Sequence, residues 1–206
     1  MTRTMTGMLT AAAVAMAAVF GFGAVRARVH AQAPATPAQA AARAAAKPAP
    51  SALARGKYLV TVGGCHDCHT PVKSGPNGFE PDMSRMLSGH PASQPLPPPP
   101  PPAGPWIGAI GAPGTAFAGP WGVSYTRNLT PDKETGLGAW TEQQFIDTLR
   151  NGRHQGRGRQ LLPPMPWQNY GQMTDADLKA VFAYLRSIPP VSNKVPDPVI
   201  AGAPGQ

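Results

Sequence analysis

Cysteine is scarce in this sequence, with two residues among 206. Two thiols are too few for a scaffold held by several disulfides, or for a zinc or iron–sulfur site with four thiolate ligands. Charged residues are scarce as well, at 14% of the chain against about 25% in an average soluble domain. Proline and glycine are instead abundant, with 27 and 23 residues. This composition excludes a large doubly wound enzyme or β-sandwich and leaves room for one modest core.

The first 31 residues have the pattern of an export signal. Arg3 gives a positive start, residues 8–25 are uncharged and apolar, and Val29-His30-Ala31 places small residues at the two positions that a signal peptidase requires. We therefore expect residues 1–31 to be a signal peptide and the remainder to be exported. The alternative is an N-terminal membrane anchor, in which residues 8–25 tether the protein to the inner membrane.

The rest of the chain divides by composition. Residues 32–50 are almost wholly Ala, Pro and Gln, which predicts an extended linker. A folded domain is expected over residues 51–192, interrupted by a proline-rich insertion at about 75–119, and residues 193–206 form a C-terminal tail. The unbroken prolines at 97–102 predict an exposed polyproline II segment. It is either a surface insertion without a function or a docking surface for a partner.

Three helices are predicted from caps and apolar spacing, over residues 51–62, 141–151 and 174–188. The second opens with Thr141 and Gln144 in a capping-box pattern. The third places apolar side chains at the i, i+3, i+4, i+7 spacing of a buried helix face. No segment alternates regularly enough to predict a strand. The expected fold class is therefore all-α, with short helices and long loops.

The clearest motif is Cys65-His66-Asp67-Cys68-His69, the C-x-x-C-H signature of haem c attachment. Two thiols at this spacing can reach the two vinyl groups of a porphyrin, and the adjacent histidine can then bind its iron. A thioredoxin-like pair would need a βαβ context, and zinc would need two further ligands from distant histidines. A Cys65–Cys68 disulfide would leave His69 without a role. We therefore predict one covalently attached haem c, with His69 as an iron ligand.

An iron held by this histidine needs a ligand on its other side. The downstream candidates are Met83, Met86, Met165, Met173, His90 and His154. Met165 is favoured because Pro164 and Pro166 restrict the backbone that presents its thioether. Met173 fits a hydrophobic staple before the third helix, and His154 lies in an arginine-rich run expected to be solvated. The alternative for Met165 is a side chain that only fills the core.

These motifs together resemble the class I cytochrome c family, and most closely the bacterial cytochrome c domains that serve periplasmic dehydrogenases. The resemblance covers residues 52–72 and 117–192. Besides C-x-x-C-H, the segments that carry it are Asn128-Leu129-Thr130-Pro131-Asp132, Thr135-Gly136-Leu137-Gly138-Ala139-Trp140 and Pro164-Met165-Pro166. It implies a cytochrome c fold, thioether bonds at Cys65 and Cys68, and iron ligands at His69 and Met165. It also implies contact between the first helix, near Gly56 and Tyr58, and the last, near Tyr184 and Leu185.

The resemblance implies a monohaem electron carrier in the periplasm and not an enzyme. Its partners would be a periplasmic dehydrogenase as electron donor and a terminal oxidase or another cytochrome of the respiratory chain as acceptor. Many such subunits have two or three haem signatures, whereas this chain has one. The alternative function is a haem enzyme or a gas or redox sensor, which needs a displaceable distal ligand. Nucleic acid is not an expected partner, because the chain has no binding motif for it.

Several residues are candidates for the surroundings of the haem. The segment Gly75-Pro76-Asn77 resembles the family segment whose proline carbonyl accepts the proximal histidine N–H, so we expect Pro76 to hold His69. Pocket or propionate contacts are considered for Trp121, Tyr125, Arg127 and Trp167, with ordinary core packing as the alternative. A basic cluster is either a docking patch for an acidic redox partner or a solvated loop; it consists of Arg150, Arg153, Arg157 and Arg159, with His154.

Overall fold

The computed structural model describes residue 36, residues 50–101 and residues 104–202. The predicted signal peptide or anchor, and nearly all of the predicted linker, lie outside the described residues. Contacts divide the chain into residues 1–47 and residues 48–206, and all described helices and strands belong to the second unit. No helix of the described residues is both long and apolar enough to cross a membrane.

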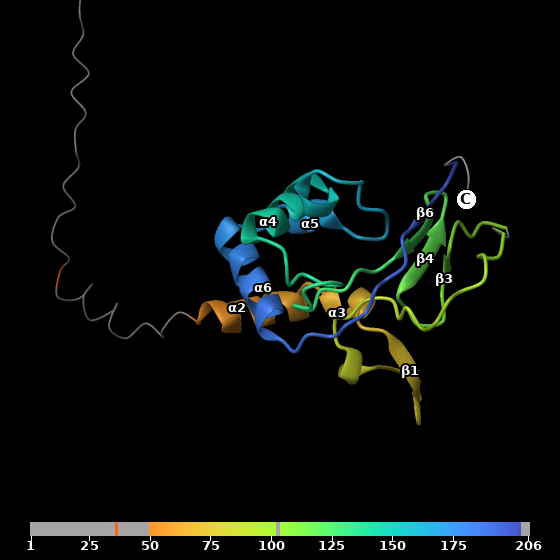
Figure 1. The fold of residues 1–206 in the computed structure, drawn as a ribbon, viewed down its shortest axis with the longest axis horizontal. Coiled ribbons are helices and arrows are strands. Elements are labelled where there is room, and N and C mark those ends of the chain that lie inside the picture. The colour runs from red at the N-terminus through yellow and green to blue at the C-terminus, as the bar shows by residue number, and fades with distance from the viewer. Residues whose placement is uncertain (1–35, 37–49, 102–103, 203–206) are drawn as a thin grey trace, which may run out of the picture. The chain divides into compact units, whose positions relative to one another are not determined.

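Three longer helices form the apolar core of this unit (Figure 1). Each begins after a hydroxyl residue whose side chain accepts a backbone amide hydrogen bond: Ser51, Thr141 and Thr174. Gln144 completes the predicted capping box. The helices and turns are α2 (Ala52–Val62), α3 (Cys65–His69), η1 (Met83–Arg85), α4 (Glu142–Asn151), η2 (His154–Gly156), α5 (Trp167–Tyr170) and α6 (Asp175–Ser187). The three predicted helices are thus confirmed.

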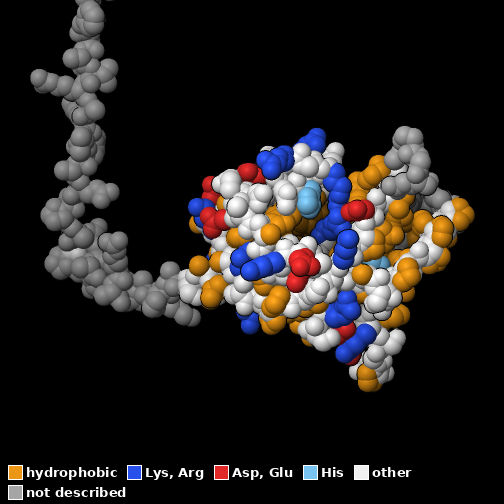
Figure 2. Space-filling view, viewed as in Figure 1, with side chains coloured by type: hydrophobic (Ala, Val, Ile, Leu, Met, Phe, Trp, Pro, Cys, Tyr) orange, Lys and Arg blue, Asp and Glu red, His pale blue; other side chains and the backbone are white. Residues whose placement is uncertain are grey.

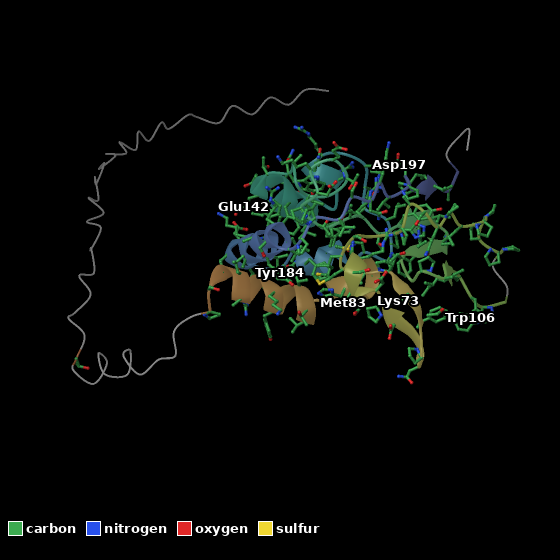
Figure 3. The ribbon with its side chains drawn as sticks, turned by 60° about the horizontal axis from the view of Figure 1, so that its bottom comes forward. Lys73, Met83, Trp106, Glu142, Tyr184 and Asp197 are labelled. Carbon is green, nitrogen blue, oxygen red and sulfur yellow. The ribbon has the colours of Figure 1, made fainter. Side chains whose placement is uncertain are left out.

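Helices α2 and α6 cross at Gly56. A Cβ atom at this position would overlap the backbone oxygen of Ala180 and would lie 2.8 Å from the Cβ atom of Tyr184. Figure 3 shows Tyr184 between the two helices. The predicted contact near Gly56 is therefore present, but Tyr58 is 56% exposed and takes no part in the core. Only glycine lets the two backbones approach this closely.

We expect Gly56→Ala to lower the free energy of unfolding by about 3 kcal/mol, because the new methyl group meets backbone that cannot move aside. The gain in helix propensity, about 1 kcal/mol, offsets only part of this cost. The measurement is urea unfolding of the haem-loaded protein. Gly75→Ala is the matched control, since its nearest neighbours would be atoms of the flexible Glu80 side chain. Equal unfolding midpoints for the two variants would contradict the crossing described here.

The prediction of an all-α fold was wrong: the structure is 32% helix and 14% strand, with two sheets. The antiparallel hairpin of β1 (Val72–Gly75) and β2 (Gly78–Pro81) forms one sheet. The other is antiparallel with the order β3-β4-β5-β6, formed by β3 (Ala109–Ile110), β4 (Ala116–Gly119), β5 (Gly122–Tyr125) and β6 (Val199–Ile200). These strands have two to four residues, too few to show an alternating pattern. Pairing between distant segments holds them instead.

The segment from residue 87 to residue 91 is buried, although it lies within the predicted insertion. The amide of Gly89 donates to the His69 carbonyl at 2.8 Å, and the amide of Leu87 donates to Thr70 Oγ1 at 3.0 Å. By contrast, the chain on either side of residues 102–103 is largely exposed, and Trp106 is 76% exposed at the edge of the structure (Figure 3). The insertion therefore contains one segment that belongs to the core beside the C-x-x-C-H motif.

His90 in this segment is fully buried and hydrogen-bonded at both ring nitrogens. Nε2 lies 3.1 Å from the Gln94 carbonyl oxygen, and Nδ1 lies 3.0 Å from Thr115 Oγ1. A carbonyl can only accept, so Nε2 carries the proton and Nδ1 accepts from the threonine hydroxyl. Burial lowers the pKa of His90 below its ordinary value of 6.5, against the smaller opposite effect of the Gln94 carbonyl. The ring is therefore neutral in the fold, and neither nitrogen is free to bind iron because both are already hydrogen-bonded.

We expect part of the acid sensitivity of the protein to come from His90. Because its pKa is lower in the folded state, the unfolded chain takes up the proton first. The stabilisation is therefore complete above about pH 6.5 and is lost as the pH falls below that value. Urea unfolding at about pH 7.5 and about pH 5.5 should show a smaller loss of stability in His90→Gln than in the wild type. Gln94→Ala keeps both the ring and the carbonyl and should retain the wild-type pH dependence; the same dependence in His90→Gln would refute the assignment.

Candidate functional site

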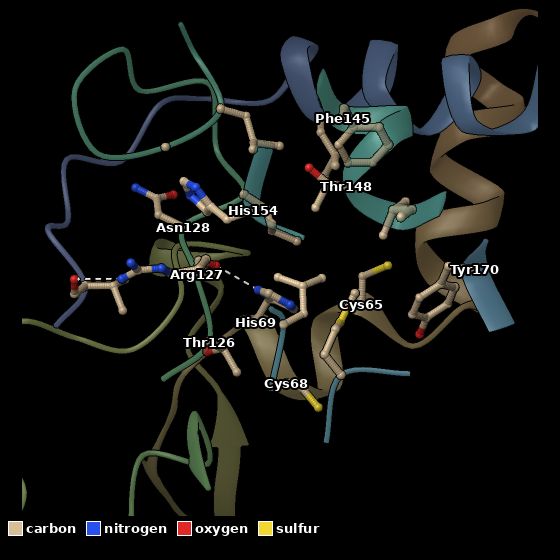
Figure 4. Close-up of a pocket in the computed structure, with 18 of the residues that line it drawn as sticks. Cys65, Cys68, His69, Thr126, Arg127, Asn128, Phe145, Thr148, His154 and Tyr170 are labelled. Carbon is tan, nitrogen blue, oxygen red and sulfur yellow. Dashed lines mark hydrogen bonds between the residues drawn. The ribbon is translucent and has the colours of Figure 1, made fainter. Parts of the chain in front are cut away.

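The C-x-x-C-H motif forms the single helical turn α3, directly after α2. Gly64 has a left-handed backbone (φ 65°), which turns the chain between the two helices. Tyr170 of α5 donates its hydroxyl to the Gly63 carbonyl and so holds α5 against this turn. Both cysteines are free thiols and line one cavity with His69 (Figure 4). Local helix geometry therefore places the three motif residues on the same cavity.

Both thiols are protonated at neutral pH. Burial raises the pKa of the Cys65 thiol to about 11, and it raises the pKa of Cys68 as well. A redox-active cysteine instead needs a lowered pKa and a thiolate. Moreover, the described residues contain no group of three or more His, Cys, Asp or Glu side chains that could hold a metal ion. These observations disfavour the thioredoxin-like and zinc alternatives.

His69 is buried, and its ring is fixed by one strong hydrogen bond. Nδ1 lies 2.7 Å from the backbone oxygen of Arg127, so it carries the proton and donates (Figure 4). Burial lowers the pKa of His69, which keeps the ring neutral. Nε2 is then the nitrogen that remains available to bind a metal.

The prediction that the Pro76 carbonyl holds His69 was wrong, because the acceptor is Arg127. Pro76 lies in the turn between β1 and β2, which form a hairpin of their own. Arg127 follows β5, 58 residues along the chain from His69. The segment after the motif therefore leaves the site, and the acceptor comes from the chain just after a strand that the sequence did not predict.

The cavity has a volume of about 460 Å³ and a mostly apolar wall. Its walls include residues of α2, α4 and α6 that are also the centre of the apolar core. The residues that belong both to the cavity wall and to the core are Leu59, Leu137, Phe145, Leu149, Leu178, Val181 and Leu185. The core of this domain is therefore built around the cavity.

Three of the six candidates for the second axial ligand line the cavity: Met165, Met173 and His154. Met83 is 59% exposed, and Met86 packs against the core without lining the cavity. His154 was expected in a solvated loop, but it faces the cavity, with its ring edge-on to Trp140 at 5.1 Å between centroids. His154 is therefore a stronger alternative to Met165 as the second iron ligand than the sequence pattern indicated.

The loop that carries Met165 is tied to β5. Ser124 donates its hydroxyl to the Pro163 carbonyl at 2.6 Å. The same strand leads to Arg127, whose carbonyl holds His69. One short stretch of chain thus holds both the predicted proximal ligand and the loop of the predicted distal ligand. Nothing in the sequence indicated this role for Ser124, because neither the strand nor its neighbour across the fold could be recognised.

The segment Asn128-Leu129-Thr130-Pro131-Asp132 reaches the cavity with its first two residues and is held by side-chain hydrogen bonds. Asn128 Oδ1 accepts from the amide and the hydroxyl of Thr130, at 3.0 and 2.7 Å. Asp132 Oδ1 accepts from the amide and the hydroxyl of Thr135, at 2.8 and 2.6 Å. A Cβ atom at Gly136 would overlap the Thr130 carbonyl oxygen, so the turn has no room for another residue type. These bonds explain why the motif combines Asn, Thr, Asp and Gly.

Cationic side chains stand at one side of this cavity. Arg127, Arg159 and Lys194 line it, together with Asp197 and Glu134, and Figure 2 shows Lys and Arg side chains around an apolar hollow. Burial and the nearby Arg127 lower the pKa of Arg159, and Asp197 only partly counters this effect. Among the ion pairs of the described residues, none includes Arg159. The site therefore favours an anionic group beside Arg159.

The other predicted surroundings divide between the cavity and the rest of the fold. Tyr125 and Arg127 line the cavity, whereas Trp121 and Trp167 do not. Of the basic cluster, Arg159 and His154 lie at the cavity. Arg150 instead pairs with Asp175 at 2.6 Å, and Arg153 and Arg157 do not line the cavity.

The residues present fit a covalently bound haem c. The apolar wall suits the porphyrin, the two thiols suit its vinyl groups, and Nε2 of His69 suits its iron. Thr126 lines the cavity, and its buried Oγ1 has no hydrogen-bond partner among the described residues, so this hydroxyl is available to donate to an anionic group such as a propionate. Arg159 offers a second such donor.

Comparisons with known proteins give a consistent picture. The sequence family described as Cytochrome c matches residues 53–189. A nicotinate dehydrogenase subunit of Pseudomonas putida is 31% identical over 144 residues, which is 70% of this chain and 9% of that protein. The fructose dehydrogenase cytochrome subunit of Gluconobacter japonicus is 31% identical over 134 residues, 65% of this chain and 21% of that subunit. The gluconate 2-dehydrogenase cytochrome c subunit of Pantoea cypripedii is 32% identical over 139 residues, which is 67% of this chain and 24% of that subunit. The chain thus spans less than a quarter of the length of these curated relatives.

Proposed function

The chain belongs to the cytochrome c family, whose members transfer electrons with a covalently bound haem c, and from this premise we propose that it is an exported monohaem carrier of single electrons. The observation that carries the proposal is one apolar cavity that brings Cys65, Cys68, His69 and Met165 together. We propose thioether attachment at the two cysteines and axial ligation by His69 and Met165.

Each residue at the site has a defined task. When bound, haem c supplies an iron that alternates between Fe(II) and Fe(III) by gaining and losing one electron. Cys65 and Cys68 would hold the porphyrin edge. The hydrogen bond from His69 Nδ1 to the Arg127 carbonyl fixes the ring and leaves Nε2 free to bind the iron. Met165 presents a thioether from a loop restrained by prolines and by Ser124. The apolar wall excludes water, so that little reorganisation accompanies a change of charge.

We propose a periplasmic dehydrogenase as the electron donor and a terminal oxidase or another cytochrome as the acceptor. The relatives support the first part, since two of those compared are cytochrome subunits of dehydrogenases. Export, by cleavage after residue 31 or by an anchor at residues 8–25, rests on the N-terminal sequence pattern.

A second functional class, a haem enzyme or a gas or redox sensor, has a specific observation in its favour. His154 lines the same cavity, so the site holds more than one candidate distal group. The two classes differ in whether an external ligand can reach the iron. In an electron carrier the sixth position is filled, whereas an enzyme or sensor needs it open or displaceable.

Carbon monoxide binding separates the two functions. The full chain, matured with haem and reduced with ascorbate or dithionite, should show the absorption spectrum of a six-coordinate ferrous c-type haem. We expect this spectrum to be unchanged after carbon monoxide is added, because Met165 fills the sixth position. Rapid formation of a carbonyl spectrum in the wild type would refute the electron-carrier proposal and favour the sensor or enzyme.

A further inference from the structure

Residues 191–200, here called the C-terminal strap, run back from α6 across the segment that holds His69. The amide of Val191 donates to Thr130 Oγ1 at 3.0 Å, and its carbonyl accepts from Asn128 Nδ2 at 2.7 Å. Asn193 Nδ2 donates to the carbonyls of Ser88 and His90, at 2.7 and 2.9 Å. Farther along, β6 pairs with β5. The sequence placed residues 193–200 in a tail, yet they are bonded to the fold along their length.

Arg127 joins this strap to the proximal side of the site. Its Nη1 donates to the carbonyls of Val195 and Pro196, at 3.0 and 2.9 Å, and its Nη2 donates to Asp197 Oδ1 at 2.9 Å. Its own backbone carbonyl accepts the hydrogen bond of His69 Nδ1 at 2.7 Å. Figure 4 shows the bond between His69 and Arg127 as a dashed line. The same residue therefore contacts the strap with its side chain and His69 with its backbone.

The two carbonyl contacts contribute more to this junction than the ion pair does. The side chain of Asp197 is 91% exposed, whereas that of Arg127 is 31% exposed. An ion pair with so exposed a partner stabilises a protein by about 1 kcal/mol or less. By contrast, Nη1 bonds both carbonyls while Nη2 reaches Asp197, so the planar guanidinium holds three acceptors of the strap in a fixed geometry that a lysine ammonium cannot reproduce. The strap thus restrains the side chain of the residue whose backbone carbonyl accepts from His69.

We propose that Arg127 is a positioning residue through which the C-terminal strap sets the strength of the His69 hydrogen bond, and hence the reduction potential of the haem. The proposal rests on the proposed function in taking His69 as the iron ligand. A strong bond at Nδ1 makes the imidazole a better electron donor, which stabilises Fe(III) and lowers the potential. Loosening the strap should therefore raise the potential.

The first test is Arg127→Lys in the full, haem-loaded chain, which keeps the positive charge and removes the fork. We expect the equilibrium constant for its oxidation by a fixed redox partner to fall by about threefold or more. We also expect the His69 Nδ1 proton of the reduced protein to exchange with solvent about tenfold faster, measured by NMR. Arg150→Lys is the matched control: Arg150 also bonds one carbonyl, of Gly171, and one carboxylate, of Asp175, but it does not line the cavity. The control should leave both values unchanged.

The second test is a double-mutant cycle with a loosened strap, in which residues 195–200 are replaced by alternating Gly and Ser. Asp197→Asn alone corrects for the lost charge. If Arg127 acts through the strap, the combined variant should match the loosened-strap variant, because the two changes break the same link. Additive shifts in potential would overturn the proposal, and so would an unchanged potential and proton exchange in Arg127→Lys.

The outcomes also separate this proposal from the proposed function. A wild type that lacks the six-coordinate spectrum contradicts the function itself. A wild type that has this spectrum, with Arg127→Lys and Arg150→Lys alike in potential and exchange, contradicts only the role of the strap. If the loosened-strap variant does not take up haem, the comparison of Arg127→Lys with Arg150→Lys still tests whether Arg127 sets the potential.

Discussion

The double substitution Cys65→Ala and Cys68→Ala is expected to yield a protein without covalent haem and with most of its helix lost. The helices α2, α4 and α6 contact one another, but apolar side chains from all three also line a cavity of about 460 Å³. If that volume stayed empty and dry, a cost of about 24 cal/mol per Å³ would give at most about 11 kcal/mol. This equals the entire stability of an ordinary domain, about 5–15 kcal/mol. The three helices cannot be expected to persist without the porphyrin.

The measurement combines haem staining of a denaturing gel with far-ultraviolet circular dichroism. Any haem held without thioether bonds is first extracted into acidic butanone, which the thioether bonds of the wild type resist. Asp67→Ala is the matched control, because Asp67 lies between the two cysteines but is exposed. It should keep both the stain and the helix. Stain that washes out of the wild type would contradict covalent attachment, and a wild-type helix signal in the extracted double variant would show that the fold does not need the porphyrin.

The parts of the fold that could be predicted are those specified by neighbouring residues. Thr141 and Gln144 mark the start of α4 within four residues, and Gly152 ends it with a left-handed backbone (φ 64°). The C-x-x-C-H motif is equally local, since one helical turn brings its three functional side chains to the cavity. Short-range chemistry of this kind can be recognised in a single sequence.

The parts that could not be predicted depend on contacts between distant residues. The bond from His69 to Arg127 spans 58 positions, and those from Asn193 to residues 88 and 90 span more than 100. Any residue can supply a backbone carbonyl, so the sequence does not reveal which one accepts from His69. The segment Gly75-Pro76-Asn77 therefore suggested Pro76 instead of Arg127. The strands could not be predicted for a related reason. Strand β5 has only four residues, including Gly122 with φ 104°, and is defined by its pairing with β4 and β6. An all-α prediction therefore missed the strand that leads to Arg127, whose carbonyl holds the predicted proximal ligand.

Met165→Ala is expected to have the second large effect, this time on the electronic properties of the haem. A thioether is a soft ligand that stabilises Fe(II), and histidine–methionine ligation raises the reduction potential. Its loss should remove the near-infrared band of sulfur-to-iron charge transfer from the oxidised protein. It should also lower the potential by about 100 mV, since the axial ligand sets haem potentials over a range of about 0.8 V. The ferrous protein should then bind carbon monoxide.

His154 and Met173 make the controls informative, because both line the same cavity. Met173→Ala removes a thioether of the same kind and should leave the band and the potential nearly unchanged. If Met165→Ala loses the band but resists carbon monoxide, the double variant Met165→Ala with His154→Ala should bind it, because His154 would have taken the vacant position. A band that survives Met165→Ala and disappears in Met173→Ala would assign the sixth ligand to the residue before α6. That outcome would overturn the ligand assignment while leaving electron transfer intact, since either thioether fills the position that a substrate would need.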